Sequence, residues 1–225
     1  MKAKIKAGNR FDSLRDFVNR VDELGDCKKI DGADWDLEIG VIGELQSAIP
    51  NSPLLLFDRI KGYPAGFRVA TNIYASNRRT ALAYGLAPDV QRIELVRALR
   101  DKFRAGPKLI PSVEVKNAPV KENVYLGDDV DLFMFPTPKW HEFDGGRYIG
   151  TGSITITRDP DEGWVNMGTY RVQIHDKNTA TVMISPGHHG GIMRQKYWDK
   201  GQSCPAVVTC GQEPMLFAAS HFEVP

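Results

Sequence analysis

The chain has 225 residues, of which 42% are hydrophobic and 25% are charged, and its net charge at pH 7 is +1. This balance is typical of a globular protein and argues against a nucleic-acid partner or a membrane-surface partner. The longest apolar runs, such as residues 53–57, are too short to span a bilayer. The basic N-terminus has no apolar segment behind it, so no signal peptide is expected.

The cysteines are few and show no metal-binding spacing: Cys27, Cys204 and Cys210. Their number and positions predict free, buried thiols in a reducing compartment, which indicates a cytoplasmic protein. A disulfide between Cys204 and Cys210 is the disfavoured alternative.

Helix and strand signals alternate along the first part of the chain. Apolar residues spaced near 3.6 predict a helix over residues 11–24, capped by Asn9 or Asp12 and ended at Gly25. The other elements expected here are a weaker helix over 38–49, strands over 53–60 and 67–73, and helices beginning near residues 77 and 89. This alternation predicts an N-terminal α/β domain over residues 1–110.

The helix that begins near residue 89 is expected to bury one apolar face. The residues at helical spacing are Ile93, Val96, Leu99 and Phe103. Gly106 and Pro107 then end the helix.

After Lys108 prolines are frequent, and the sequence patterns indicate strands more often than helices. The strands expected are 113–115, 123–126, 148–158, 163–175, 179–184 and 206–209, with short helices over 192–200 and 214–219. Three hairpin-linked strands predict a β-barrel or an antiparallel sheet over residues 111–225. We place the boundary between the two domains within residues 108–118.

An amide and a guanidinium lie five residues apart in the strand-like run that follows Trp164. The amide oxygen of Asn166 is a possible ligand for a divalent metal, and the fork of Arg171 suits a carboxylate or a phosphate. Residues five apart on a strand point to opposite faces unless a bulge intervenes, and Gly168 is a candidate bulge. The alternative is that both are ordinary solvent-facing strand residues.

A histidine pair, His188 and His189, precedes Gly190 and Gly191 in a turn that leads into a predicted helix. Glycine backbone amides and a helix N-terminus together attract phosphate, and histidine is a common metal ligand. The alternative is a surface turn whose histidines have no function.

Several segments, in the right order, resemble the UbiD family of decarboxylases that use prenylated FMN. These segments are LLLFDRIKGYPAGFRVATNIYASNRRTALAYGL, YLGDDVDLFMFPTPKWHEFDGGRYIGTG, DPDEGWVNMGTYRVQIHDKN, SPGHHGG and MRQKYWDKGQSCPAVVTCGQEPMLFAAS. The resemblance implies an α+β fold in which the α/β domain (1–110) precedes a split β-barrel, similar to flavin reductases, that binds the cofactor (111–225).

The resemblance also assigns roles to individual residues. Asn166 matches the amide that binds a divalent metal, usually manganese, on the cofactor phosphate. His189 matches a second metal ligand, which is an arginine in other members, and His188 is the fallback. Arg171 matches the catalytic arginine beside the substrate carboxylate.

Further residues match positions along the flavin. These are Gly168, Thr169, Tyr170 and Arg171 on the strand that lies along the cofactor. Thr151 matches a residue near the cofactor, and Ser220 and His221 fall where the family contacts the flavin. Potassium is a further candidate ion. Tyr63, Arg78 and Arg79 are candidates for lining the cleft.

The function implied is non-oxidative decarboxylation, or the reverse carboxylation, of an aromatic or α,β-unsaturated carboxylic acid. The flavin carries the difficult chemistry, and the protein supplies orientation and an electrostatic clamp. A flavin prenyltransferase would supply the cofactor, and the protein is expected to be a homo-oligomer or a partner subunit.

The resemblance further implies an N-terminal part. The family's glutamate metal ligand, its acidic proton donors and its C-terminal domain would follow Pro225. One rival is therefore a non-catalytic fragment or assembly subunit that needs a partner chain. Another is a flavoprotein that uses unmodified FMN for electron transfer.

Overall fold

The computed structural model describes residues 11–90, 92–106 and 110–222. The first sheet has the order β1-β2-β3, in which β1 and β2 are parallel and β2 and β3 antiparallel. The elements of this part are α1 (Leu14–Glu23), β1 (Cys27–Asp31), α2 (Glu38–Ser47), β2 (Leu54–Asp58), β3 (Val69–Thr71), α3 (Asn77–Ala83) and α4 (Arg92–Arg104). The predicted alternation of helices and strands is confirmed.

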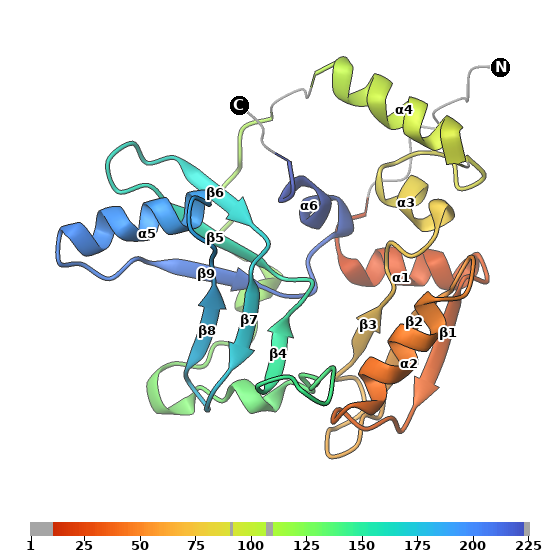
Figure 1. The fold of residues 1–225 in the computed structure, drawn as a ribbon, viewed down its shortest axis with the longest axis horizontal. Coiled ribbons are helices and arrows are strands. Elements are labelled where there is room, and N and C mark those ends of the chain that lie inside the picture. Colours follow the sequence, from red (N-terminus) through yellow and green to blue (C-terminus); the bar gives the residue numbers. More distant parts are fainter. Residues whose placement is uncertain (1–10, 91, 107–109, 223–225) are drawn as a thin grey trace.

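Strand β2 forms the centre of this sheet, and helices cover both of its faces (Figure 1). Alternate residues of a strand point to opposite faces. Leu54 and Leu56 pack against α1, whereas Leu55 and Phe57 pack around Ile39 of α2. Burial on both faces explains why the sequence of β2 is an unbroken apolar run.

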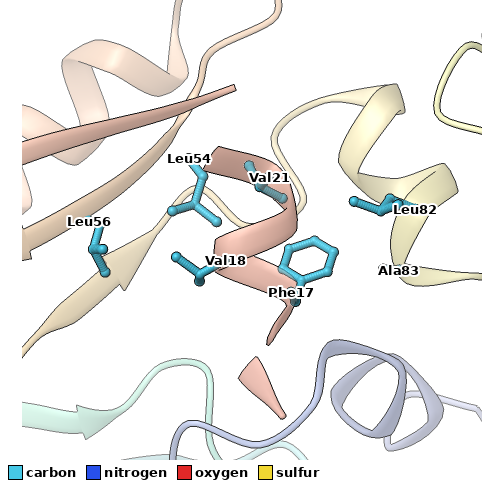
Figure 2. Close-up of a cluster of buried hydrophobic side chains, with 7 residues drawn as sticks. All are labelled: Phe17, Val18, Val21, Leu54, Leu56, Leu82 and Ala83. Carbon is cyan, nitrogen blue, oxygen red and sulfur yellow. The ribbon is translucent and has the colours of Figure 1, made fainter. Parts of the chain in front are cut away.

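Helix α1 contributes the aromatic anchor of this core. Phe17 and Val21 are fully buried, and Figure 2 shows them with Val18 beside Leu54 and Leu56. Each such buried side chain stabilises the fold by roughly 1.5–3 kcal/mol relative to exposure.

Two details at the start of the chain differ from the prediction. Ser13 caps α1, because its hydroxyl accepts a hydrogen bond from the Asp16 amide at 3.1 Å; Asp12 does not, and Asn9 lies outside the described residues. Strand β1 was not predicted. Its sequence, CKKID, is mostly exposed and polar, so the parallel pairing with β2 rather than an apolar pattern makes it a strand.

The expected end of the first helix at Gly25, with φ of 69°, is confirmed.

The predicted inner face of α4 is wrong. Leu95 is the buried residue, whereas Ile93 and Val96 are more than half exposed and Phe103 is 44% exposed. Leu95 packs with Ala81 of α3, and the partly buried Leu99 joins the same cluster. Apolar residues occur on two faces of this helix, so helical spacing alone selected the wrong one.

A buried arginine shapes the loop that follows β3. Arg79 is 1% exposed and forms an ion pair with Asp26 at 2.7 Å. It also donates hydrogen bonds to the carbonyl oxygens of Ser52, Asn72 and Ile73. Arg79 therefore holds the loop from inside the fold and does not line a cleft as predicted.

The second part contains two three-stranded antiparallel sheets with the orders β4-β7-β8 and β6-β5-β9. The strands are β4 (Arg147–Gly150), β5 (Ile154–Arg158), β6 (Val165–Gly168), β7 (Arg171–Ile174), β8 (Ala180–Met183) and β9 (Ala206–Thr209). No closed barrel is seen among the described residues.

The two long strands predicted over 148–158 and 163–175 are each broken, and their halves join different sheets. The breaks fall at residues 151–153 and 169–170. Residues 151–153 are Thr-Gly-Ser, and across the second break the apolar positions change from 165 and 167 to 170, 172 and 174. The alternation is therefore interrupted where the chain turns the corner between the sheets. Gly150 permits this corner, since a Cβ there would lie 2.6 Å from the Val172 side chain.

The segment before these sheets lacks the predicted strands 113–115 and 123–126. It contains only the short 3-10 helices η1 (Pro119–Lys121), η2 (Gly127–Asp129) and η3 (Leu132–Met134). Val113 is 81% exposed and Val124 is 62% exposed. Valine favours β-strands, but neither residue pairs with a sheet among the described residues.

Arg147 connects the two parts of the chain. Its guanidinium lies 4.1 Å from the centre of the Trp35 ring and donates hydrogen bonds to the carbonyls of Phe135 and Thr137 and to the Tyr63 hydroxyl. Tyr63 therefore serves this contact between the first sheet and the second part.

Two helices complete the structure. Helix α5 (His189–Asp199) packs against β5 and β6. Helix α6 (Pro214–Ala219) lies near the centre of the molecule in Figure 1, where its Ala218 packs into the same buried cluster as Ala81 and Leu95. The Tyr74 hydroxyl donates a hydrogen bond to the carbonyl of the first residue of α6.

All three cysteines are free, as expected. They are not buried as predicted, because Cys27 and Cys204 are half-buried and Cys210 is exposed. None of the helices in the described ranges combines the length and apolar character needed to cross a membrane.

Candidate functional site

Asn166 lies in the layer between strand β6 and helix α5. It is 7% exposed, pairs with Thr157 across the β5–β6 ladder, and donates a hydrogen bond of 3.5 Å from its Nδ2 to the Thr157 hydroxyl. That hydroxyl in turn lies 3.2 Å from the sulfur of the buried Met193 in α5. Across the described residues, the Asn166 side-chain oxygen accepts no hydrogen bond, so it is available to a ligand.

Tyr170 joins the β6–β7 connection to the N-terminus of α5. Its ring lies over Gly168, where an added Cβ would be 2.6 Å from ring carbon. Its hydroxyl accepts a hydrogen bond of 3.3 Å from the Gly190 amide. An added Cβ at Gly190 would lie 3.0 Å from the same hydroxyl, so a side chain there would also be tight, although less so than at Gly168. This close approach brings the GTYR segment against the helix.

The prediction of a bulge at Gly168 is wrong. The β5–β6 register is regular through the pair Thr155–Gly168, and the irregularity of these sheets lies between Tyr148 and Gly150. The close approach at Gly168 is made by the Tyr170 ring.

Replacing Gly168 with alanine should displace the Tyr170 ring and lower the free energy of unfolding by about 1–3 kcal/mol, the usual cost of overpacking. Gly152→Ala is the matched control, because a Cβ there meets no atom within 4 Å. Urea unfolding of both variants would check this. Equal stability of the two variants would refute the ring-on-glycine contact.

The histidine pair lies at the start of α5. His188 is the N-cap residue, and its ring lies edge-on to Tyr170 at 6.1 Å between centres. His189 is the first helical residue, and its ring packs edge-on against Trp164 at 4.9 Å. His189 and Met193 are four residues apart on one helix face. Since Met193 contacts Thr157, this face is directed toward the layer that holds Asn166.

Arg171 begins β7 at the corner between the two sheets. It is exposed, and no hydrogen bond or ion pair joins its guanidinium to another described residue. Gly150 pairs with Val172, so Thr151 and Arg171 are the next residues along the two antiparallel strands. The chain switches sheets at residues 169–170, so the argument that Asn166 and Arg171 point to opposite faces of one strand does not apply.

The other predicted flavin contacts are less closely grouped. Thr169 lies beside Tyr170 in the connection between β6 and β7. Ser220 and His221 follow α6, and both hydrogen-bond to the carbonyl of Phe217. Phe217 of α6 and Thr151, at the corner between the two sheets, line the same open cavity. The cavity therefore lies between α6 and that corner.

An ion pair fixes α5 on the β5–β6 hairpin. Asp159 is 6% exposed and accepts a hydrogen bond of 2.7 Å from Lys196 of α5. That hydrogen bond, with those from the Asp161 and Glu162 amides, lowers the pKa of Asp159 from 3.8 to about 2. The ion pair joins the C-terminal half of α5 to the β5–β6 hairpin.

The lowered pKa of Asp159 predicts a pH dependence of stability. A carboxyl whose pKa is lower in the folded state stabilises the fold above its unfolded pKa, and this contribution disappears as the pH falls through the folded pKa. The free energy of unfolding should therefore fall between about pH 4 and pH 2, and fall less in Asp159→Asn. Urea titrations at each pH would measure both slopes. Identical slopes would contradict the assignment.

The arrangement fits a metal only in part. In residues 11–90, 92–106 and 110–222 no three His, Cys, Asp or Glu side chains are grouped to hold an ion. Asn166 and His189 are two ligands of the types that manganese accepts, an amide oxygen and an imidazole nitrogen. The remaining ligands would have to come from the cofactor phosphate, water or other residues.

Sequence reasoning missed the residues that support these side chains. Thr157, Met193, Trp164 and Lys196 carried no separate signal, because each is an ordinary residue in a strand, helix or turn. Tyr170 was predicted as a flavin contact only, although a bulky ring between Gly168 and Gly190 is the contact that joins the two segments.

Two family models match the chain. The 3-octaprenyl-4-hydroxybenzoate carboxy-lyase N-terminal domain matches residues 18–100, and the Rift-related domain of the same carboxy-lyase matches residues 112–225. Among curated relatives, the pyrrole-2-carboxylic acid decarboxylase of Pseudomonas aeruginosa is 33% identical over 94% of this chain and 44% of its own length. The phenolic acid decarboxylase of Sedimentibacter hydroxybenzoicus is 30% identical over 93% of this chain and 45% of its own.

Solved structures of decarboxylases are also similar to this chain. The closed form of the S. hydroxybenzoicus vanillic acid decarboxylase superposes with a TM-score of 0.85 at 26% identity, over 92% of this chain and 44% of that chain. An evolved dimeric UbiD-class enzyme from Pelotomaculum thermopropionicum, in complex with prFMN, gives 0.82 at 26% identity over 95% and 47%. The chain thus spans somewhat less than half the length of these relatives. Since the Rift-related model alone covers half of the chain, the chain belongs to the UbiD family.

Proposed function

We propose that this chain is the cofactor-binding part of a carboxy-lyase that decarboxylates an aromatic or α,β-unsaturated acid, or carboxylates the product in reverse. The observation that supports this most directly is the layer in which Asn166, Gly168 and Tyr170 meet the N-terminus of α5. An amide ligand, a glycine-rich turn and a helix N-terminus together suit a phosphate with its divalent ion. The prenylated flavin would supply the electron-accepting chemistry when bound.

Within this proposal, Asn166 and His189 bind manganese on the cofactor phosphate, with His188 as the alternative ligand. Thr169 and Tyr170 lie along the flavin, and Thr151, Ser220 and His221 border it. Potassium remains a further candidate ion. We infer that the two sheets correspond to a split β-barrel and that the unit over 111–225 binds the flavin after an N-terminal domain over 1–110.

Arg171 is proposed to bind the substrate carboxylate. Its guanidinium is exposed and has no partner among the described residues, so its donors are available. Its planar fork matches a carboxylate bidentately and stays charged at every physiological pH. Held there, the acid would be oriented with its carboxylate at a fixed distance from the flavin-binding strand.

The names of the relatives support an aromatic acid as the proposed substrate. The relatives described above are named for pyrrole-2-carboxylic, phenolic and vanillic acid. The test is to produce the chain with a flavin prenyltransferase and assay CO2 release from these acids and from cinnamic acid. We expect release from at least one acid, and none from protein loaded with unmodified FMN. Equal release from both preparations would contradict the role of the prenylated flavin.

The second candidate is an assembly subunit that binds the cofactor but needs a partner polypeptide. The observation in its favour is the exposed Arg171, whose guanidinium forms no ion pair with another described residue. Cofactor-loaded chain without turnover, which gains turnover when mixed with a polypeptide corresponding to the relatives' remaining length, would support it. Oligomerisation and a cytoplasmic location stay predictions.

A further inference from the structure

A cavity lies between the first sheet and the corner of the second part. Its volume is about 430 Å³, within the range typical of small-molecule sites. One side is formed by the loop after β3, including Asn72 and Tyr74, and the other by Trp140, Thr151 and Phe217. Sites at the interface of two structural units are common for small ligands.

The wall of the cavity is aromatic. The rings of Tyr74 and Phe217 lie nearly parallel, with 6.2 Å between their centres and an interplanar angle of 23°. Trp140 and the aliphatic Leu14 and Ile73 extend this wall. Such a surface favours a flat ring by apolar burial and by offset stacking.

Several polar groups of the lining are already paired with the protein. The Tyr74 hydroxyl donates to the carbonyl of Pro214, and the Trp140 indole donates to Tyr148 at 3.2 Å. The Gln212 amide donates to Gly152 at 2.6 Å. The Thr71 hydroxyl also lines the cavity and is buried without a hydrogen-bond partner among the described residues, so it is left for a neutral polar group of a ligand. No Lys, Arg, Asp or Glu occurs among the described lining residues.

His141 is the histidine among the described lining residues, and two carboxylates lie next to it. His141 lies 3.6 Å from the carboxylate of Glu44 and 3.6 Å from that of Asp144. Neither of these carboxylates is among the described lining residues. A carboxylate ligand would lose part of its hydration in the cavity, and no Lys or Arg of the described lining would replace it.

We propose that this cavity binds a small, neutral aromatic molecule and discriminates against the corresponding carboxylate. The inference goes beyond the proposed function, because the ligand is neither flavin nor metal and Arg171 is not among the described lining residues. The cavity shares one residue with the proposed flavin site, Thr151. Its ligand class also differs from the acid that Arg171 would bind.

The test compares benzamide with benzoate, which have nearly the same shape and differ in charge, on purified flavin-free chain by ligand-detected NMR and calorimetry. Benzamide should bind, and benzoate should bind at least about tenfold more weakly. Gly152→Leu should abolish benzamide binding, since Gly152 lines the cavity and a Cβ there meets no atom within 4 Å. Gly152→Ala should give a smaller loss.

Ser112→Leu is the control, because Ser112 is exposed and does not line the cavity. Circular dichroism of each variant checks its fold. Equal affinity for benzamide and benzoate, no binding of benzamide, or unchanged binding in folded Gly152→Leu would each overturn the proposal. The assay contains no cofactor, so its failure would leave the proposed decarboxylase function untouched.

Discussion

Replacing Arg171 with alanine should leave flavin and metal content unchanged and lower decarboxylation by about 10²–10³-fold or more, as removal of a transition-state donor typically does. Arg171 is exposed, without a partner among the described residues, so its loss should not disturb the fold. The measurement is CO2 release by cofactor-loaded protein, in whichever preparation is active, the chain alone or the chain with its partner polypeptide.

Arg171→Lys is the informative companion variant. Lysine keeps the charge and loses the bidentate fork, so turnover should recover only in part. Unfolding midpoints of both variants should match that of the parent chain. Unchanged turnover in a cofactor-loaded Arg171→Ala protein would remove Arg171 from catalysis.

Replacing Arg79 with leucine should lower the free energy of unfolding by about 3–5 kcal/mol, the cost of leaving a buried partner charge unpaired. Asp26 would lose its ion pair at 2.7 Å while it is only 14% exposed. The carbonyls of Ser52, Asn72 and Ile73 would lose their donor in the same variant. Because Asp26 retains some contact with water, the lower end of this range is expected.

The adjacent Arg78 provides a matched control. It is exposed and makes one long hydrogen bond of 3.4 Å to the Leu24 carbonyl. Arg78→Leu should therefore change stability by less than about 0.5 kcal/mol. Urea unfolding of the two variants side by side measures the difference. Similar losses in both would contradict the role of Arg79 as the internal support of this loop.

Parts of the fold could be predicted because one local pattern determined them. The apolar run of β2 indicates a strand covered on both faces, and α1 and α2 supply the cover. Strand β1 could not be found in the same way, because its CKKID sequence becomes a strand only through pairing with β2. The buried face of α4 depends on where α6 packs, which is information from the far end of the chain.

The candidate site shows the same division. Residue spacing placed Asn166 and Arg171 on one strand and predicted opposite faces, and this failed because the chain changes sheets between them. The family resemblance selected Asn166, Gly168 and His189, and the structure brings their segments together. The contact of the Tyr170 ring that joins these segments could not be predicted from the sequence, because it depends on a helix 20 residues further along the chain.

The most direct test of the account is the cofactor and metal content of Asn166→Ala beside the parent chain. Both would be produced with a flavin prenyltransferase, and the released flavin and bound manganese would be measured by mass spectrometry. We expect prenylated FMN with about one manganese in the parent, and a parallel loss of both in the folded variant. Full retention of flavin and manganese in Asn166→Ala would contradict the proposed site.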